Sequence, residues 1–98
     1  MIEIRQTEQV KKWLKALKDS RAKAKILIRI ERMREGNFGD VNSIGDGYSE
    51  LKIHQGKGYR VYFANRNNQI ILLLCGGDKT TQQDDIKKAK QIAKQWGF

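Results

Sequence analysis

Residues 48–63 read YSELKIHQGKGYRVYF and show the clearest period-two alternation in the chain. Apolar side chains alternate with polar ones on both sides of Lys57, which two glycines flank. Glycines at this spacing are typical of a tight turn between antiparallel strands. The pattern therefore predicts a β-hairpin, with one strand over 48–54 and the next over 59–64.

Two apolar side chains from each strand must meet one core. They are Leu51 and Ile53 on the first strand and Val61 and Phe63 on the second. A slip of one residue would bury charged side chains, so the register is constrained. Pairing Ile53 with Val61 satisfies the constraint, and Leu51 then faces Phe63. This pairing closes an odd-length loop centred on Lys57, whose neighbouring glycines allow positive φ.

The other face of the hairpin is predicted to meet water. In this register His54 lies opposite Arg60, and opposed Cβ atoms are roughly 5 Å apart. Lys52 lies opposite Tyr62. Arginine can bind a phosphate bidentately, lysine stabilises charge in the transition state, histidine moves protons near neutral pH, and tyrosine can stack on a base. The face thus predicts an RNA-cleaving site with His54 as general base, although a polar face is also ordinary for an antiparallel sheet.

The flanking sequence predicts the remaining elements. They are a strand over 1–6, a helix capped by Thr7, a helix from Asp19 or Ser20 to about Glu35, a short strand within 41–44, a strand over 70–75 and a helix capped by Thr80 or Thr81. Consecutive strands joined by tight turns pair antiparallel. We therefore expect one domain over residues 1–98 of the α+β class. It has a small antiparallel sheet of about four strands, two N-terminal helices packed on one face, and a C-terminal helix.

Several residues are expected to serve the core. Trp13, Met33 and Trp96 fall on the apolar stripes of helices, and Cys75 lies in an apolar strand, where it would be buried and inert. The segment Gly76-Gly77-Asp78-Lys79-Thr80-Thr81 leads into the last helix. It could bind an anion or be an ordinary capped connection, and the sequence leaves both open.

The chain carries a large excess of positive charge. Its 98 residues include twenty Lys and Arg against eleven Asp and Glu, a net charge of +9. Such a field attracts phosphate backbones or an acidic partner. One cysteine excludes an intrachain disulfide, and one cysteine with one histidine disfavours a zinc site, so we expect no metal or cofactor. The cysteine usage and the absence of an apolar N-terminal run predict a cytoplasmic protein.

Four segments with a characteristic spacing point to a family. They are Gly36-Asn37-Phe38-Gly39-Asp40, Glu50-Leu51-Lys52-Ile53, Gly58-Tyr59-Arg60-Val61-Tyr62-Phe63 and Gly76-Gly77-Asp78-Lys79, followed by Gln82 and Asp85. In this order they resemble the HigB-like addiction-module killer proteins of the RelE/ParE superfamily. The resemblance covers nearly the whole chain and implies a fold with a small antiparallel sheet and two N-terminal helices.

The same resemblance implies an activity and partners. It implies the toxin of a type II toxin–antitoxin module, an endoribonuclease that needs no metal and cleaves mRNA, commonly on the ribosome, so that translation stops. The RNA's own 2′-hydroxyl attacks the adjacent phosphate. The implied partner is a cognate antitoxin, often a HigA-like helix-turn-helix protein, through which alone the toxin contacts operator DNA.

The resemblance implies functional roles for three residues of this chain, by their positions in the matching segments. Arg60 matches the family's phosphate-binding arginine, Lys52 matches one of its strand lysines, and Lys79 lies near the basic residue after the last strand. Other positions depart from the family. RelE has a lysine at the position of Glu50 and a tyrosine early in the final helix, where this chain offers Asp85 or Ile86. Some HigB toxins end in a catalytic histidine, whereas this chain ends Trp96-Gly97-Phe98.

The assignment of the proton carrier therefore depends on the hairpin register, which favours His54. Asp78 is the weaker candidate. The predicted catalytic residues are Arg60, His54, Lys52 and Lys79, and the predicted RNA-binding residues are Tyr62, Lys57, Tyr59 and Asp78. The alternative is a ParE-like toxin that inhibits DNA gyrase without a nuclease site, and a third possibility is a protein that binds RNA without cutting it. A proton carrier beside a phosphate-binding arginine favours cleavage.

Overall fold

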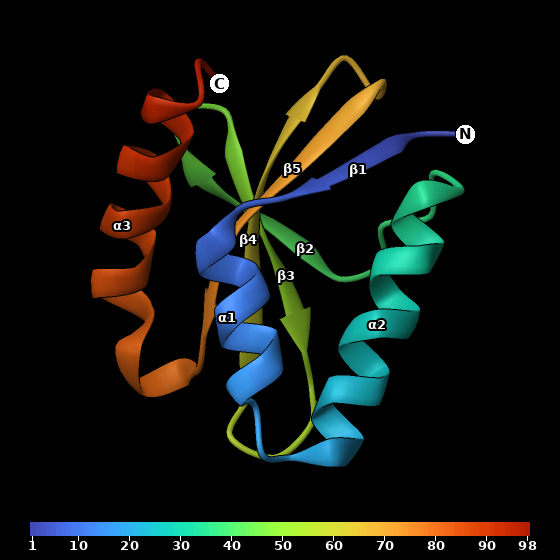
Figure 1. The fold of residues 1–98 in the computed structure, drawn as a ribbon, viewed down its shortest axis with the longest axis vertical. Coiled ribbons are helices and arrows are strands. Elements are labelled where there is room, and N and C mark those ends of the chain that lie inside the picture. The colour runs from blue at the N-terminus through green and yellow to red at the C-terminus, as the bar shows by residue number, and fades with distance from the viewer.

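The computed structural model describes residues 1–98 as a five-stranded sheet with three α-helices (Figure 1). The elements are β1 (Glu3–Gln6), α1 (Glu8–Ala16), α2 (Ser20–Arg34), β2 (Val41–Gly45), β3 (Tyr48–Ile53), β4 (Tyr59–Arg66), β5 (Ile70–Gly77), the 3₁₀ turn η1 (Lys79–Thr81) and α3 (Gln82–Gln95). Every helix and strand predicted from the sequence is present. None of the helices has the length and apolar character needed to cross a membrane.

The two N-terminal helices begin at the predicted capping residues, whereas Thr81 precedes α3 without a capping hydrogen bond from its side chain. The Thr7 hydroxyl caps α1 by accepting a hydrogen bond from the Val10 N–H at 3.1 Å. The Asp19 carboxylate caps α2 by accepting from the Ala22 N–H at 3.0 Å. Gly36 follows α2 with a φ of +86°, which only glycine adopts without strain. Local residue chemistry therefore sets where both N-terminal helices begin and where α2 ends.

The strands follow the order β1-β5-β4-β3-β2. All neighbouring strands are antiparallel except β1, which lies at the edge and pairs parallel with β5. The prediction of about four antiparallel strands is therefore corrected to a mixed sheet of five, within the predicted α+β class. Parallel pairing needs a long connection, and here the connection between β1 and β5 contains both N-terminal helices and three strands.

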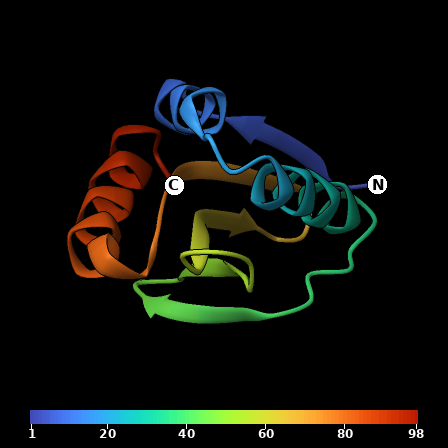
Figure 2. The ribbon, with the colours of Figure 1, turned by 90° about the horizontal axis from the view of Figure 1, so that it is seen from below.

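Both faces of the sheet carry a core. Figure 2 shows α1 and α2 side by side over the sheet, with α3 apart from them. The first core contains Leu51, Ile53, Val61 and Phe63 of the sheet with Ile26, Ile30 and Met33 of α2. The second contains Tyr48, Tyr62, Leu72, Leu74 and Cys75 of the sheet with Ala89, Ile92 and Ala93 of α3. The prediction that the second hairpin face meets water is therefore wrong wherever α3 covers it.

The last turn of α3 also differs from the prediction. Trp96, expected in the core, is 47% exposed. The chain reverses at Gly97, which has a φ of +73°, and the Phe98 N–H bonds back to the Ala93 carbonyl at 2.8 Å. Phe98 packs against the second core, and the Arg66 guanidinium lies 3.8 Å from the centre of its ring. The terminal phenylalanine thus occupies the place predicted for the tryptophan.

The hairpin register differs from the predicted one by two residues. Leu51 pairs with Val61, and Ile53 pairs with Tyr59, so the loop spans 54–58 and is centred on Gly56 instead of Lys57. A shift of two residues keeps every side chain on its face, so the alternation permits both registers. Gly56 has a φ of +57°, and a Cβ there would lie 2.5 Å from the Asp19 carboxylate, so glycine lets this loop pack against the α1–α2 junction.

Candidate functional site

A basic hollow lies at the turn end of the hairpin and has a volume of about 530 Å³. Its lining residues are Lys52, Ile53, His54, Gln55, Gly56, Lys57, Gly58, Tyr59, Arg60 and Lys79. Four of them are cationic, one is a histidine, and none is acidic. Six of the eight predicted site residues therefore line one hollow, although they come from β3, β4, the loop between them and η1.

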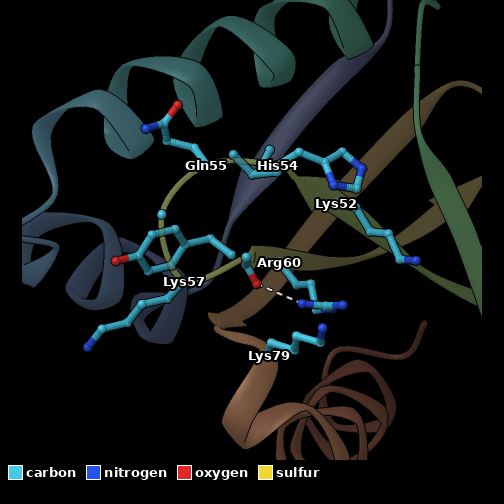
Figure 3. Close-up of a pocket in the computed structure, with 10 residues that line it drawn as sticks. Lys52, His54, Gln55, Lys57, Arg60 and Lys79 are labelled. Atoms are coloured by element: carbon cyan, nitrogen blue, oxygen red, sulfur yellow. Dashed lines mark hydrogen bonds between the residues drawn. The ribbon is translucent and has the colours of Figure 1, made fainter.

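The cations of the basic hollow do not all point into it. Figure 3 shows the Lys79 ammonium directed toward the Arg60 guanidinium, whereas Lys57 points away from both. A Cβ placed on Gly58 would lie 3.6 Å from Arg60 Nη1 and 3.7 Å from Lys79 Cβ, so these two side chains flank that glycine. Lys52 is the direct cross-strand partner of Arg60. Like charges brought together at one place favour an anion between them.

Arg60 forms part of the wall of the hollow and is only 9% exposed. Its Nη1 donates a hydrogen bond to the Gly58 carbonyl at 2.6 Å. Its Nε lies 3.8 Å from Glu50 Oε2 and has no hydrogen-bond partner. The expectation that Arg60 emerges into water directly opposite His54 is therefore wrong, because β3 ends at Ile53 and Lys52 takes the place opposite Arg60.

His54 lies exposed at the rim and pairs with a residue to which the sequence analysis assigned no role. Its Nε2 hydrogen-bonds the carboxylate of Asp40, in the segment before β2, and this bond lowers the pKa of the Asp40 carboxyl. Arg29 of α2 holds that segment by donating to the carbonyls of Phe38 and Asp40 at 3.1 and 3.2 Å. It also donates to the Lys52 carbonyl at 2.7 Å. Arg29 thereby ties the Asp40 segment to β3 next to His54.

Two predicted RNA-binding residues have other surroundings. Tyr62 is fully buried in the second core, where desolvation and the nearby Glu50 and Asp85 carboxylates raise the pKa of its hydroxyl. It cannot stack on a base, so that prediction is wrong. Asp78 caps η1 by accepting from the Thr80 N–H at 2.9 Å and the Thr80 hydroxyl at 2.6 Å, and these bonds lower the pKa of its carboxyl. Its carboxylate is thus engaged at the start of η1.

The glycine pair before Asp78 serves packing. Gly76 and Gly77 belong to β5 and not to a loop. A Cβ on Gly76 would lie 2.3 Å from the Trp13 ring, and one on Gly77 would lie 1.8 Å from the Asp85 carboxylate. Glycine is needed here because a side chain has no room on either face. This geometry favours the ordinary capped connection over an anion-binding loop.

Three residues of the segments that carry the resemblance surround the site, although the sequence assigned them no role there: Asp40, Glu50 as the partner of Arg60, and Gln82. Glu50 is buried beneath the hollow and accepts hydrogen bonds from Gln82 Nε2 at 3.0 and 3.3 Å. The sequence placed Glu50 in a strand beside charged residues, but it did not show that the C-terminal helix covers this face of the sheet and buries Glu50. No group of three or more His, Cys, Asp or Glu side chains is placed to hold a metal ion.

Comparisons with known proteins agree with this architecture. The family model described as phage-derived protein Gp49-like (DUF891) matches residues 12–96. An uncharacterized protein of Haemophilus influenzae is 53% identical over 97 residues, which cover 99% of this chain and 98% of that protein. The free E. coli toxin RelE, solved as a double arginine mutant, has the same fold, with a TM-score of 0.70, 13% identity, and coverage of 92% of this chain and 95% of that one. The chain therefore has a RelE-like fold and belongs to the Gp49-like family of phage-derived proteins.

Proposed function

We propose that this protein is the toxin of a type II toxin–antitoxin module and that it cleaves mRNA. The observation that carries the proposal is the basic hollow, where Lys52, Arg60 and Lys79 gather with His54 at the rim and no acidic residue in the lining. Such a site suits a phosphodiester, whose charge increases as the phosphorus becomes pentavalent. The RelE-like fold supports the proposal, since the protein that shares it is described as a toxin.

In this proposal Arg60 and Lys79 bind the scissile phosphate. Nη1 of Arg60 donates to the Gly58 carbonyl and Nε faces Glu50, so the remaining donors of the guanidinium are available to two phosphate oxygens. Lys52, on the same rung of the hairpin, stabilises the additional negative charge of the transition state. The hollow thus supplies positioning and charge, which are the main requirements of phosphoryl transfer.

His54 then takes the proton of the 2′-hydroxyl. Its Nε2 donates to Asp40, which fixes the ring and leaves Nδ1 as the proton acceptor. The 2′ oxygen forms a bond to phosphorus while the bond to the 5′ oxygen breaks, and that oxygen gains a proton from solvent. The products are a 2′,3′-cyclic phosphate and a 5′-hydroxyl. The atoms balance without a metal or cofactor, so none enters the proposal.

The proposed partners follow from the same assignment. A cognate antitoxin, HigA-like and with a helix-turn-helix domain, would neutralise the toxin and carry it to operator DNA. The substrate would be mRNA bound to a cytoplasmic ribosome. The net charge of +9 supports association with RNA and with an acidic partner.

The proposal is tested by mapping RNA 5′ ends after brief induction in cells, with and without blocked translation initiation. We expect new 5′-hydroxyl ends within translated messages, and we expect them to disappear when initiation is blocked. Stalled gyrase–DNA complexes without new RNA ends would instead support the ParE-like alternative. Growth arrest with neither product would support RNA binding without cleavage.

A further inference from the structure

A buried polar cluster lies directly behind the basic hollow. It consists of Glu50, which is 4% exposed, the buried Arg60, and the partly exposed Gln82 at the start of α3. We propose that Glu50, braced by Gln82, is a positioning residue that fixes the Arg60 guanidinium for the scissile phosphate. This inference rests on the proposed function. In it, Glu50 does not contact RNA and acts only through its effect on Arg60.

The contacts of Arg60 leave one edge for a ligand. Nη1 is bound to the Gly58 carbonyl at 2.6 Å, and Nε faces Glu50 Oε2 at 3.8 Å. Nη2 makes no hydrogen bond within the chain, and Arg60 lines the hollow. The guanidinium is therefore held through Nη1 and faces Glu50 through Nε, and Nη2 remains without a partner in the chain. A buried arginine without a counter-charge would be costly, and Glu50 is the acidic group that provides this charge.

Gln82 prevents Glu50 from closing fully on Arg60. Its Nε2 donates to Oε2 of Glu50 at 3.0 Å and to Oε1 at 3.3 Å, so both carboxylate oxygens are drawn toward α3. Glu50 therefore attracts Arg60 across 3.8 Å without forming the bidentate pair that would occupy the donors of the guanidinium. This arrangement orients Arg60 and still leaves its donors free for a phosphate.

The neighbourhood of Glu50 argues against a role in folding alone. Tyr62 is its direct cross-strand partner, yet the buried Tyr62 hydroxyl has no hydrogen-bond partner. A carboxylate selected only to satisfy the second core would accept from that hydroxyl. Glu50 instead has its polar contacts with Gln82 and Arg60.

The first experiment compares Glu50→Gln with wild-type protein in single-turnover cleavage of ribosome-bound mRNA and in binding of a non-cleavable RNA that is 2′-deoxy at the scissile position. We expect the cleavage rate to fall on the order of tenfold through misorientation, while the RNA Kd stays unchanged or decreases because a negative charge beside Arg60 is gone. Gln82→Ala should change the rate in the same direction by a smaller factor, and it serves as the second variant if Glu50→Gln does not fold. Gln83→Ala, at an exposed neighbouring position of α3, is the matched control and should behave as wild type.

The second readout does not depend on cleavage. The buried Arg60 Nε–H should give a protected ¹⁵N–¹H resonance that moves and exchanges faster with water in Glu50→Gln, and not in Gln83→Ala. The inference is wrong if Glu50→Gln changes neither the Arg60 resonance nor the cleavage rate. It is also wrong if the cleavage rate and RNA binding fall by the same factor and that factor matches the loss of folded protein. If wild-type protein cleaves no RNA, the proposed function fails, and the Arg60 resonance still decides whether Glu50 positions this side chain.

Discussion

Lys52 and Arg60 are direct cross-strand partners at the turn end of the hairpin. Like charges on one rung of a sheet destabilise it, so this arrangement calls for a compensating group. Glu50 supplies it for Arg60 from the buried side, and an anion in the basic hollow would supply it from the open side. The rung thus concentrates positive charge where the RNA phosphate is proposed to bind.

Replacing Arg60 tests both the fold and the site. Arg60→Ala would leave Glu50 buried without a counter-charge, and we expect the free energy of unfolding to fall by about 3–5 kcal/mol. Arg60→Ala combined with Glu50→Gln should recover much of that loss. Urea unfolding measures both variants. Equal stability of the single and double variants would contradict the proposed pairing.

A milder change separates activity from folding. Arg60→Lys keeps the positive charge but loses bidentate phosphate binding, so we expect a folded protein that no longer arrests growth and still binds its antitoxin. Growth curves after induction, together with co-purification with the antitoxin, provide the measurement. Full toxicity of Arg60→Lys would show that the phosphate site is assigned wrongly.

Lys52→Ala should separate stability from catalysis. Removing one of two opposed cations should leave the free energy of unfolding unchanged or raise it by up to about 1 kcal/mol. The cleavage rate should fall by about a hundredfold, because a charge that stabilises the transition state is lost. Lys12→Ala, an exposed position on α1 outside the hollow, is the control. Retained cleavage in Lys52→Ala would remove this residue from the mechanism.

The Asp40–His54 pair predicts a pH dependence of stability. The hydrogen bond from His54 lowers the folded-state pKa of Asp40 below its ordinary value of 3.8, so the pair stabilises the fold above that value. This contribution is lost as pH falls through the lowered pKa. The difference in Tm between wild type and Asp40→Asn should therefore shrink between pH 5 and about 2.

In a His54→Ala background, Asp40→Asn should no longer change this pH dependence, because the hydrogen bond is already gone. The double variant should cleave at the rate of His54→Ala alone, and Asp40→Asn alone should lose less, since Asp40 acts through His54. Additive losses would mean that the two residues act separately.

Tyr62→Phe tests the reassignment of this residue from the RNA surface to the core. The hydroxyl is buried without a partner, so its removal should leave stability unchanged or raise it by about 1 kcal/mol. The Kd for RNA should stay the same. Thermal unfolding and RNA titration provide the measurements, and weaker RNA binding at unchanged stability would return Tyr62 to the site.

Much of the candidate site could be predicted because its members lie near one hairpin. His54, Lys57 and Arg60 fall within seven residues of sequence, and turn glycines bring their strands together. The pairing of Asp40 with His54 could not be predicted, since Asp40 lies in a segment without periodicity that Arg29 of α2 holds in place. Gln82 could not be paired with Glu50 either, because no local pattern specifies which strand residues the last helix approaches.

Local chemistry along the chain was enough to define the helices, their caps at Thr7 and Asp19, and the side chains that share each face of the hairpin. Only the tertiary structure determined the register in which Lys52 opposes Arg60. Only the packing of α3 showed that the hairpin face predicted to be exposed to solvent forms part of a second core. The reason is physical: capping and alternation depend on residues a few positions apart. A two-residue slip leaves the alternation unchanged, and the cover over a sheet depends on contacts between segments far apart in sequence.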